Sequence, residues 1–501
     1  MRRPAMIGRR MTRRQFLNLA GAAGLAAARP WPVLEARRGT FEPAQAPAGP
    51  WASVDAILAR IVPPKFPARD FDVSKYGAVG NGTTPCTAAF RAAVAACHAA
   101  GGGRVLVPPG RFLTGPIHLL GRVDLHVSEG ATILFSRDTK DYLPLVFTRW
   151  EGVELMNYSP LVYAFGQEDV AVTGGGTLDG NADEACWWPW KGTGAPPGGP
   201  NQAQARARLM DLAERGVPVA ERIFGEGSFL RPNFIQFYRC ANVLIEGVRI
   251  VNSPMWEIHP VLCSNVTIRK VTVDSHGPNN DGCDPESCRD VLVEDCTFDT
   301  GDDCIALKSG RNADGRRLAV PVENIVIRDC TMKDGHGGVV IGSEMSGGAR
   351  NVFVERCRMD SPQLDRALRI KTNSVRGGFV ENVFMRDVTI GQVAEAVVTI
   401  DYFYEEGDSG AFPPLVRNVE LRNVSSRKSR YGLLLRGYGR DPVRDVRLVD
   451  CRFENVAEGD VVEGVEDLVF RNVVVNGKVR NDRITAGAKQ RKQLLEDLET
   501  R

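Results

Sequence analysis

A short unit that begins with Asn or Asp recurs along the second half of the chain, and it constrains the fold more than any other feature. The units are Asn242-Val-Leu-Ile, Asn265-Val-Thr-Ile, Asp290-Val-Leu-Val, Asn324-Ile-Val-Ile, Asn351-Val-Phe-Val, Asn382-Val-Phe-Met, Asn418-Val-Glu-Leu, Asp445-Val-Arg-Leu and Asp467-Leu-Val-Phe. Successive units start 22 to 36 residues apart. Self-similarity at this period is typical of solenoid proteins, in which each repeat packs only against its neighbours.

The spacing of apolar residues inside each unit predicts two short strands joined at a corner. Counting from the Asn or Asp as zero, positions +1 and +3 are apolar, and position +6 is always Val or Cys. Positions +1 and +3 lie on one face of a strand, whereas the change of parity before +6 requires a bend. The polar residue at zero suits a turn, because its side chain can hydrogen-bond to nearby backbone. We therefore expect an all-β chain folded as a parallel β-helix.

The Val or Cys at +6 is expected to form an interior ladder, since stacked coils repeat about every 4.8 Å. Four of the twelve cysteines occupy this position: Cys296, Cys330, Cys357 and Cys451. We interpret them as small core residues rather than as disulfides or metal ligands. Cys86 with Cys97, and Cys283 with Cys288, remain candidate disulfide pairs.

The ends of a solenoid must be covered, and the rest of the chain offers candidate covers. Residues 84–99 form the clearest helical pattern, which predicts an N-terminal capping helix. Residues 29–68 are rich in Pro and Ala and predict a linker or wrapping segment. The β-helix catalytic domain is expected over 69–480, and 481–501 is expected to be a charged, helical C-terminal tail.

Residues 183–232 interrupt the strand pattern and predict an insertion that is a candidate wall of a cleft. The segment contains Trp187, Trp188 and Trp190. These side chains would either stack on sugar rings or pack the insertion onto the solenoid, and the sequence does not decide between the two.

The first residues predict an export signal. Thr12-Arg13-Arg14-Gln15-Phe16-Leu17 precedes an apolar stretch from Leu19 to Ala28, which resembles a twin-arginine signal peptide over residues 1–28. A membrane anchor is the weaker alternative, because the stretch is shorter than the ~20 residues that span a bilayer. Export by the twin-arginine route would place the mature chain in the periplasm or outside the cell.

The charge of the mature chain limits its partners. Residues 1–28 hold six arginines and no acids, so their removal changes the formal net charge from +2 to −4. Such a chain has no overall attraction for nucleic acid or for another polyanion. We expect no nucleic-acid partner and no membrane association after removal of the signal, and an acidic substrate would require a local basic pocket.

Four successive coils carry polar motifs. They are Asn279-Asn280-Asp281, Gly301-Asp302-Asp303, Gly335-His336-Gly337 and Arg369-Ile370-Lys371. Asp302 lies at +12 from Asp290 and His336 lies at +12 from Asn324, which places both side chains on one face of neighbouring coils. Asp281 precedes Asp302 by 21 residues, about one coil. The motifs therefore predict a single site.

Crowded carboxylates suit acid–base catalysis. Like charges a few Å apart raise the pKa of at least one member, so one carboxyl can hold a proton while another stays charged. Glycoside hydrolysis needs this division, because an acid protonates the leaving oxygen and a base activates water. Each motif alone is usually a solvated turn, a tight bend or an exposed charged pair. Their recurrence on four coils favours catalysis.

These residues resemble the polygalacturonases, glycoside hydrolase family 28, which belong to the pectin-lyase-like β-helices. The likeness begins at Phe71-Asp72-Val73-Ser74-Lys75-Tyr76-Gly77-Ala78, passes through Asn252-Ser253-Pro254-Met255-Trp256 and the four motifs, and reaches Asp401-Tyr402-Phe403-Tyr404. The family's first motif normally reads Asn-Thr-Asp, whereas this chain has Asn280 in the middle. The resemblance implies a right-handed, single-stranded parallel β-helix that hydrolyses α-1,4-galacturonosyl linkages of pectin or its oligosaccharides. It also implies inversion of the anomeric carbon, and no metal or cofactor.

The resemblance implies a role for each acid–base residue. Asp302 would be the general acid, and Asp281 and Asp303 would activate the hydrolytic water. His336 would tune the protonation of Asp302.

The resemblance also implies a substrate-binding set. Arg369 and Lys371 would bind the sugar carboxylate, and so supply the local basic pocket. Tyr404 would line the sugar site, with Tyr402 as the alternative. We also expect Asn279, in the first motif, to contact the substrate.

Three other functions remain open at this point. A rhamnogalacturonan hydrolase of the same family would differ only in subsites that the sequence does not identify. A calcium-dependent pectate lyase shares the solenoid, and its calcium would need several carboxylates such as the three aspartates. A carbohydrate-binding β-helix without catalysis would use the aspartates only to end turns. Exo action is slightly favoured over endo action, because the insertion at 183–232 could close one end of the cleft.

Overall fold

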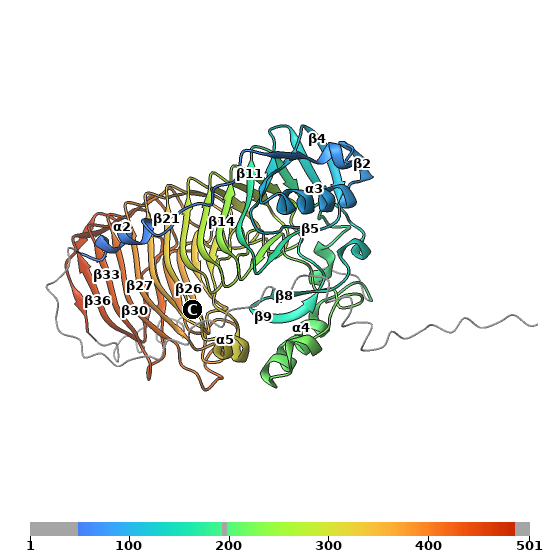
Figure 1. Ribbon diagram of the computed structural model, residues 1–501. Coiled ribbons are helices and arrows are strands. Elements are labelled where there is room, and N and C mark those ends of the chain that lie inside the picture. Colours follow the sequence, from blue (N-terminus) through green and yellow to red (C-terminus); the bar gives the residue numbers. More distant parts are fainter. Residues whose placement is uncertain (1–48, 193–197, 486–501) are drawn as a thin grey trace, which may run out of the picture. The chain divides into compact units, whose positions relative to one another are not determined.

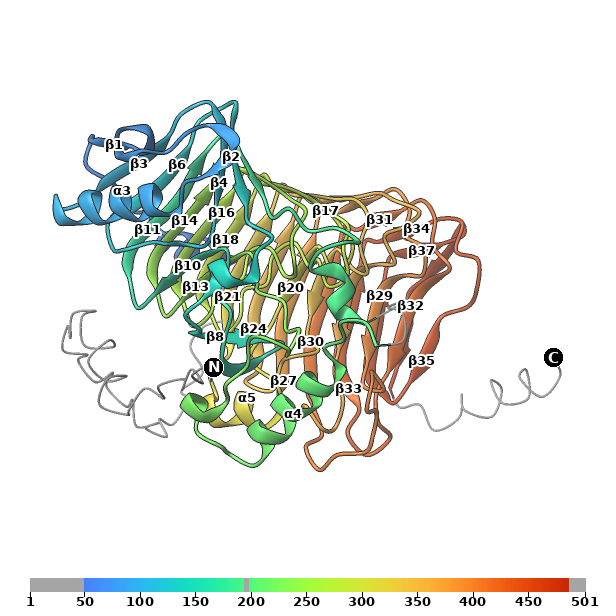
Figure 2. The same ribbon diagram turned by 90° about the vertical axis from the view of Figure 1, so that its right-hand side faces the viewer.

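The computed structural model describes residues 49–192 and 198–485, and within these ranges the chain from residue 50 forms a right-handed parallel β-helix (Figure 1). The predicted signal peptide at 1–28, the first part of the linker and most of the C-terminal tail lie outside the described residues. Coils follow one another in chain order, from blue to red in Figure 2. The coils contribute strands to three sheets, joined at corners, and in two coils a single bridge takes the place of a strand of the third sheet.

The first sheet has fourteen strands, all parallel except the last. In spatial order they are β1 (Asp70–Asp72), β3 (Gly103–Val107), β6 (Val123–Val127), β11 (Glu168–Gly174), β14 (Ala241–Glu246), β16 (Ser264–Arg269), β18 (Arg289–Glu294), β21 (Val322–Arg328), β24 (Ala349–Glu355), β27 (Phe379–Arg386), β30 (Leu415–Arg422), β33 (Val443–Val449), β36 (Val465–Arg471) and β39 (Arg483–Ile484).

The second sheet follows the same coils. Its strands are β2 (Asn81–Pro85), β4 (Gly110–Thr114), β7 (Ala131–Phe135), β12 (Thr177–Asp179), β15 (Arg249–Val251), β17 (Thr272–Ser275), β19 (Thr297–Thr300), β22 (Thr331–Met332), β25 (Arg358–Met359), β28 (Thr389–Ile390), β31 (Ser425–Ser426), β34 (Arg452–Phe453), β37 (Val473–Val475) and β38 (Lys478–Arg480).

The third sheet, which the sequence pattern did not predict, is made of short strands. One part contains β5 (Ile117–His118), β10 (Val162–Phe165) and β13 (Ile235–Tyr238), and the other contains β20 (Ile305–Leu307), β23 (Val339–Ile341), β26 (Arg366–Lys371), β29 (Ala396–Asp401), β32 (Tyr431–Arg436) and β35 (Val461–Glu463). Single bridges at Ile258 and Cys283 connect the two parts from coil to coil.

The remaining elements lie outside the three sheets. They are the antiparallel hairpin β8 (Val146–Trp150) and β9 (Val153–Asn157), the helices α2 (Ala52–Leu58), α3 (Thr87–Ala99), α4 (Ala203–Glu214) and α5 (Asn312–Leu318), and the 3-10 turns η1 (Val73–Tyr76), η2 (Thr139–Tyr142), η3 (Trp188–Lys191) and η4 (Val219–Glu221).

The predicted ladders are present. Val266 of β16 pairs with Val291 of β18, which pairs in turn with Ile325 of β21, so the +1 positions stack in register. Every +6 side chain in the nine units is at most 2% exposed. All twelve cysteines are free thiols, so the candidate pairs Cys86 with Cys97 and Cys283 with Cys288 are not disulfides. The cysteines of the ladder are core residues, as predicted.

The Asn or Asp that begins each unit has a left-handed backbone conformation. Its φ lies between 54° and 60° in all nine units, a region that Asn and Asp enter more readily than other non-glycine residues. The asparagine side chains hydrogen-bond along the solenoid, for example from Asn265 to Asn242 at 2.8 Å and from Asn382 to Asn351 at 2.9 Å. The residue therefore makes the turn and also links adjacent coils.

Both ends of the solenoid are covered. Helix α3 begins at Thr87 rather than at Thr84, because residues 81–85 form β2, and its Phe90 and Val94 are buried against the first coils. At the other end β38 and β39 pair antiparallel with the last coil, so residues 483–484 of the predicted tail are a strand. The outer face of the first sheet is covered by α2, whose Val54 and Ile57 pack on successive strands.

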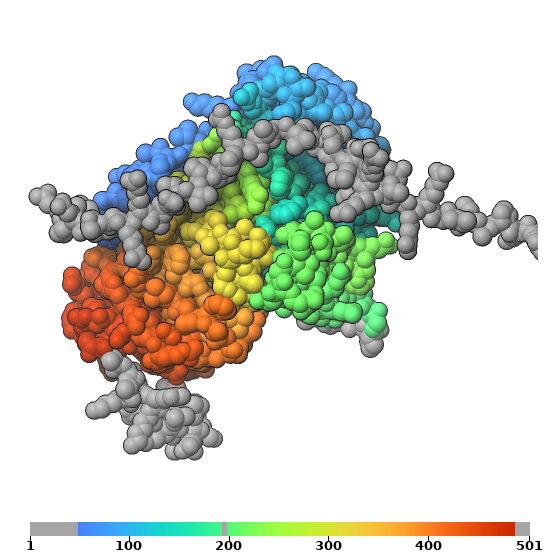
Figure 3. All heavy atoms as spheres, turned by 60° about the horizontal axis from the view of Figure 1, so that its bottom comes forward, coloured from blue at the N-terminus to red at the C-terminus, as the bar shows by residue number. Residues whose placement is uncertain are grey.

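The predicted insertion docks on the β-helix beside the hairpin β8–β9. Helix α4 packs against β9 and lies next to α5, and Figure 3 shows the green and yellow segments side by side at the surface. Arg222, just after η4, makes a buried bidentate ion pair with Asp314 of α5 at 2.7 and 3.0 Å. A buried pair of this kind fixes position, because removal of either partner leaves an uncompensated buried charge.

Candidate active site

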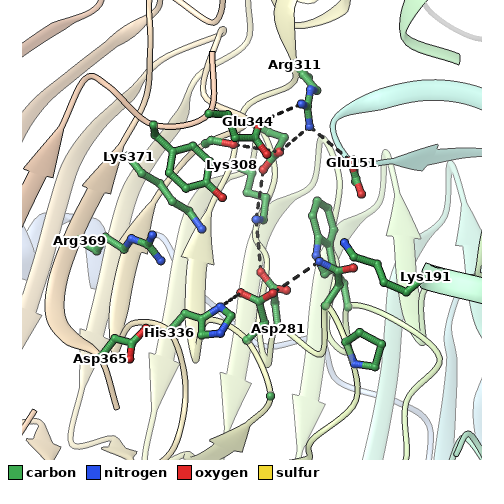
Figure 4. A pocket seen from close by; sticks show the side chains of 18 of the residues that line it. Glu151, Lys191, Asp281, Lys308, Arg311, His336, Glu344, Asp365, Arg369 and Lys371 are labelled. Carbon is green, nitrogen blue, oxygen red and sulfur yellow. Dashed lines mark hydrogen bonds and ion pairs between the residues drawn. The ribbon is translucent and has the colours of Figure 1, made fainter. Parts of the chain in front are cut away.

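The four polar motifs meet along one stripe of the solenoid, around the third sheet. Asp281 follows β17, Asp302 and Asp303 lie between β19 and β20, and His336 lies between β22 and β23. Because equivalent positions stack from coil to coil, Asp281, Asp302 and His336 line one cavity of about 580 Å³ (Figure 4). The coil spacing thus brings together motif residues that are up to 92 residues apart in the sequence, from Asn279 to Lys371.

Most of the predicted site residues line this cavity. They are Asn279, Asp281, Asp302, His336, Arg369, Lys371 and Tyr404. Asp303 is fully buried, and its carboxylate lies 2.6 Å from Nζ of Lys371 and 3.6 Å from the guanidinium of Arg369. Asp303 therefore holds in place the two cations that were predicted to bind a sugar carboxylate.

Of the two tyrosines that the sequence left open, Tyr404 faces the cavity. The charged groups of Arg369 and Lys371 lie 5.6 and 5.4 Å from the centre of its ring. Tyr402 is fully buried, and its hydroxyl accepts a hydrogen bond from the Val416 amide at 2.8 Å. Asn279 lines the cavity while its side-chain oxygen accepts a hydrogen bond from Arg231 at 2.8 Å.

The carboxyl groups of Asp281 and Asp302 have pKa values that are shifted in opposite directions. Burial, followed by the negative charge of Asp302, raises the pKa of Asp281 to about 8. Burial also tends to raise the pKa of Asp302, but the hydrogen bond to His336 and the positive charge of Lys371 outweigh it and hold that pKa below its ordinary value. The proton of the ligand-free pair therefore lies on Asp281, although the resemblance assigns the acid role to Asp302.

His336 supplies part of this asymmetry. Its Nδ1 lies 2.9 Å from a carboxylate oxygen of Asp302, and this hydrogen bond raises the pKa of His336 above its ordinary value. The imidazolium and Asp302 thus form an ion pair at the rim of the cavity. Because the pair is partly exposed, a bound substrate can change the charges that His336 and Asp302 carry.

A buried lysine that the sequence did not reveal lies beneath the catalytic cluster. Nζ of Lys308 is 3.4 Å from Asp281, 3.4 Å from Asp284 and 3.3 Å from Glu344, and it stands 4.2 Å above the ring of Trp256. These negative charges outweigh burial and raise the pKa of Lys308 well above its ordinary value. In the sequence, Lys308 could have been noticed only by its position directly after the apolar strand β20.

The wall of the cavity is a network of ion pairs that the sequence pattern did not predict. Glu151, in the turn of the hairpin β8–β9, accepts from Arg206 of α4 at 2.6 Å and from Arg311 at 3.3 Å. Arg311 also lies 3.2 Å from Glu344 and 3.1 Å from Glu405. No local pattern brings these residues together, because they come from the hairpin, the insertion and later coils.

The tryptophans of the insertion pack rather than face the cavity. Trp187 is 1% exposed and stacks edge-on against Trp190, with ring centroids 4.7 Å apart. The indole N–H of Trp188 donates to the backbone oxygen of Ser253 at 2.8 Å. The tryptophan that lines the cavity is instead Trp256, which the sequence analysis placed in a separate motif.

The three aspartates could also offer oxygen ligands to a cation, since one oxygen of each lies within 4.8 Å of the others. Two ammonium groups already neutralise the cluster, because Lys371 lies 2.6 Å from Asp303 and Lys308 lies 3.4 Å from Asp281. A calcium ion would meet these cations in addition to the proton on Asp281. The donor set is therefore a poor fit for the calcium site of a lyase.

Comparisons with known proteins agree on one family. The family model for Glycosyl hydrolases family 28 matches residues 226–456, which include all four motifs. The crystal structure of a hyperthermoactive exopolygalacturonase from Thermotoga maritima is 47% identical and has a TM-score of 0.85, over 87% of this chain and 98% of that chain. A "Probable polygalacturonase" from Vitis vinifera is 28% identical over 383 residues, 73% of this chain and 70% of its own length. The "Exo-poly-alpha-D-galacturonosidase" of Dickeya chrysanthemi is 26% identical over 459 residues, 81% of this chain and 74% of its own length.

The likeness to the Thermotoga structure joins sequence and fold over nearly the whole of that chain. The predicted β-helix and the predicted family are both confirmed by it and by the family model. This chain belongs to the glycosyl hydrolases of family 28, and it is a glycosidase.

Proposed function

We propose that this glycosidase hydrolyses α-1,4-galacturonosyl linkages of pectic galacturonan or its oligosaccharides, and that it acts from a chain end. The observation that carries the proposal is the neighbouring pair Asp281, whose pKa is raised, and Asp302, whose pKa is lowered, beside the cations Arg369 and Lys371. A proton donor and a carboxylate beside fixed cations suit cleavage of a bond next to a uronate. The printed names of the three relatives above support galacturonan as the substrate.

In the proposed reaction Asp302 is the acid. A uronate that binds Arg369 and Lys371 cancels the positive charge of Lys371, which helps to hold Asp302 ionised, so the proton of Asp281 moves to Asp302. Asp302 then gives this proton to the glycosidic oxygen as the bond to C1 breaks. Water attacks C1 and passes a proton to the Asp281 carboxylate, with Asp303 close by. The products leave Asp281 protonated and Asp302 charged, which is the protonation of the ligand-free site.

We infer that water attacks directly and inverts the anomeric carbon. Acid and base of inverting glycosidases commonly stand roughly 6.5–9.5 Å apart, so the crowding of these aspartates does not by itself indicate inversion. Support comes from burial, since Asp281 is 3% exposed and Asp303 is fully buried. A carboxylate in such a position reaches the sugar through a water molecule. Proton NMR of the first product formed would show the β anomer, and the α anomer would refute the inference.

We infer exo action from the wall of the cavity. The hairpin β8–β9 contributes Glu151 to the lining of the cavity, and the insertion contributes Lys191 and Arg206. A wall built by these segments would stop a long chain from passing through, so that only a terminal sugar enters. The Thermotoga relative, named an exopolygalacturonase, supports this assignment.

A rhamnogalacturonan hydrolase stays the second candidate, because the two reactions use the same acid–base chemistry. Galacturonan is favoured because seven cations line the cavity, more than one uronate needs. A carbohydrate-binding protein without catalysis would not need a proton held at the centre of the cleft.

We also propose that residues 1–28 direct export by the twin-arginine route, to the periplasm or beyond, where a plant polysaccharide is accessible. The arginine pair and the short apolar stretch in the sequence support this proposal. Replacement of Arg13 and Arg14 by lysines should retain the chain in the cytoplasm, and unchanged export would refute the route.

The decisive experiment is hydrolysis of polygalacturonate in EDTA by the chain without residues 1–28. We expect reducing ends to rise without the absorbance of unsaturated uronates, and monosaccharide to accumulate from the start. Asp302→Asn should abolish the signal. Absorbance that requires calcium would indicate a lyase, and activity only on rhamnogalacturonan would replace the substrate.

A further inference from the structure

We propose that Lys191 is a second uronate-binding cation, which holds the carboxylate of the sugar on the other side of the scissile bond from Arg369 and Lys371. The inference rests on the proposed function, because it names the substrate specificity of that same site. Three observations support it. Within the described residues Lys191 has no counter-ion, its side chain lies in the cavity, and the insertion fixes its position.

Among the residues that the structure describes, Lys191 is the lysine of the cavity without an ion pair. Each of the other six lysines and arginines that line it lies within 4.0 Å of a carboxylate: Arg206, Lys308, Arg311, Arg366, Arg369 and Lys371. Within the described ranges 49–192 and 198–485, Lys191 has neither an ion pair nor a hydrogen-bond acceptor for its ammonium. The adjoining residues 193–197 are Thr, Gly, Ala, Pro and Pro, so they carry no acidic side chain.

The surroundings leave the ammonium of Lys191 short of negative charge. Glu151 attracts it, but the carboxylate of Glu151 already accepts from Arg206 at 2.6 Å and from Arg311 at 3.3 Å. Burial lowers the pKa of Lys191 and, together with the positive charges of Arg231 and Arg206, outweighs the negative charges of Glu151 and Asp302. A half-buried ammonium without a partner is costly, and a carboxylate that enters the cavity would relieve that cost.

Lys191 lies on the opposite side of the cavity from the predicted uronate site. In Figure 4 its side chain points inward from the right, Arg369 and Lys371 lie on the left, and Asp281 lies between them. A glycosidic bond placed over Asp302 would have one sugar toward each side. Each sugar carboxylate would then meet its own cation.

The insertion holds Lys191 rigidly. Lys191 ends the turn η3, in which Trp188 donates to the Ser253 backbone at 2.8 Å. Trp188 occupies the space that a side chain at position 277 would need, since a Cβ on Gly277 would lie 2.2 Å from the indole nitrogen. The amide of Gln202 closes the segment by a hydrogen bond to the Trp190 oxygen at 2.8 Å. The tryptophans thus position a cation instead of stacking on sugars, and this preorganisation favours binding.

The consequence is a requirement for two free uronates, one on each side of the bond that breaks. Methyl esterification of either sugar removes its charge and should lower kcat/KM. Replacement of the cation that binds the esterified carboxylate should then have no further effect on kcat/KM. Each cation can in this way be matched to one sugar.

The test uses digalacturonate and its two monomethyl esters with the enzyme and four variants. Lys191→Met should lower kcat/KM on digalacturonate roughly 10- to 100-fold, the range for loss of one charge-assisted hydrogen bond. Esterification of one sugar should lower kcat/KM of the wild type but not of Lys191→Met. Esterification of the other sugar should lower kcat/KM of the wild type but not of Arg369→Met. Lys191→Arg should restore most activity, and Lys140→Met, an exposed lysine outside the cavity, should match the wild type.

Four outcomes would overturn the inference. They are Lys191→Met within about twofold of an active wild type, a Lys191→Arg variant no better than Lys191→Met, insensitivity of both cation variants to the same ester, and hydrolysis of polygalacturonate without hydrolysis of digalacturonate. A wild type that hydrolyses no galacturonan would instead refute the proposed function. Thermal unfolding of each variant separates loss of binding from loss of the fold.

Discussion

Replacement of Asp281 by Asn should make the stability of the protein fall less steeply as pH rises toward neutral. Asn has the shape and charge of the protonated carboxyl that the ligand-free site contains. In the wild type the pKa of Asp281 rises from its ordinary value of 3.8 to about 8 on folding. Folding therefore takes up a proton at this residue at any pH between these values.

The magnitude follows from that proton. A pKa that is raised in the folded state contributes its full stability below the unfolded value, and that stability is lost as pH rises toward the folded pKa. One proton taken up on folding changes the free energy of unfolding by about 1.4 kcal/mol per pH unit. Between pH 5 and pH 7 the wild type should therefore lose roughly 3 kcal/mol relative to Asp281→Asn, whatever offset separates them at pH 5.

Equilibrium unfolding in urea at pH 5, 6 and 7, followed by tryptophan fluorescence, measures this difference. The free energies of unfolding of the two proteins must be compared, because buried Asp284 and Glu257 also have raised pKa values. These two residues by themselves make the free energy of unfolding of the wild type depend on pH. Asp302→Asn is the second comparison. Because the negative charge of Asp302 raises the pKa of Asp281, the stability of this variant should fall less steeply between pH 5 and pH 7 than that of the wild type. Parallel curves for the wild type and Asp281→Asn would refute the placement of the proton.

Three further predictions follow from the same contacts. The Asp302→Asn variant should keep its fold and lose roughly 10²- to 10⁴-fold in kcat on polygalacturonate, as expected for loss of a general acid, and a smaller loss would assign the acid elsewhere. Asp281 should lose its proton near pH 8, so kcat/KM should fall about tenfold per pH unit above that pH. Activity that still rises at pH 9 would contradict this. Lys308→Met should lower the free energy of unfolding at pH 7 by roughly 3 to 5 kcal/mol, since it leaves Glu344 buried beside fewer cations, and an unchanged urea midpoint would count against a structural role for Lys308.

The regular part of the fold could be predicted because it is local. Apolar residues at +1, +3 and +6 determine which side chains enter the core, and the Asn or Asp at zero sets the turn. The third sheet was not predicted, because several of its strands, such as β20 and β23, have only three residues. Alternation cannot be recognised over so short a run. Where a coil is regular, the sequence is therefore a sufficient guide.

The candidate site divides in the same way. Asp302 and His336 could be placed because each stands at a fixed offset from its repeat unit, and stacking converts equal offsets into proximity. Glu151, Lys191 and Arg206 could not, because the hairpin and the insertion reach the cavity through contacts between distant segments. Lys308 was missed for another reason, since its charge is hidden under the catalytic cluster and is satisfied by acids of neighbouring coils.

The acid–base residues and the wall of the cavity are held in place by different kinds of contact. The acid–base residues lie on coils whose spacing is set by backbone ladders and the interior side chains at +6, so any shift in their geometry would disturb the core. The wall is held instead by polar anchors, namely the buried pair of Arg222 with Asp314 and the Trp188 hydrogen bond to Ser253. Polar anchors of this kind can change with the insertion while the ladders stay intact. Lys191 therefore lies where substrate preference can vary without a change in the catalytic aspartates.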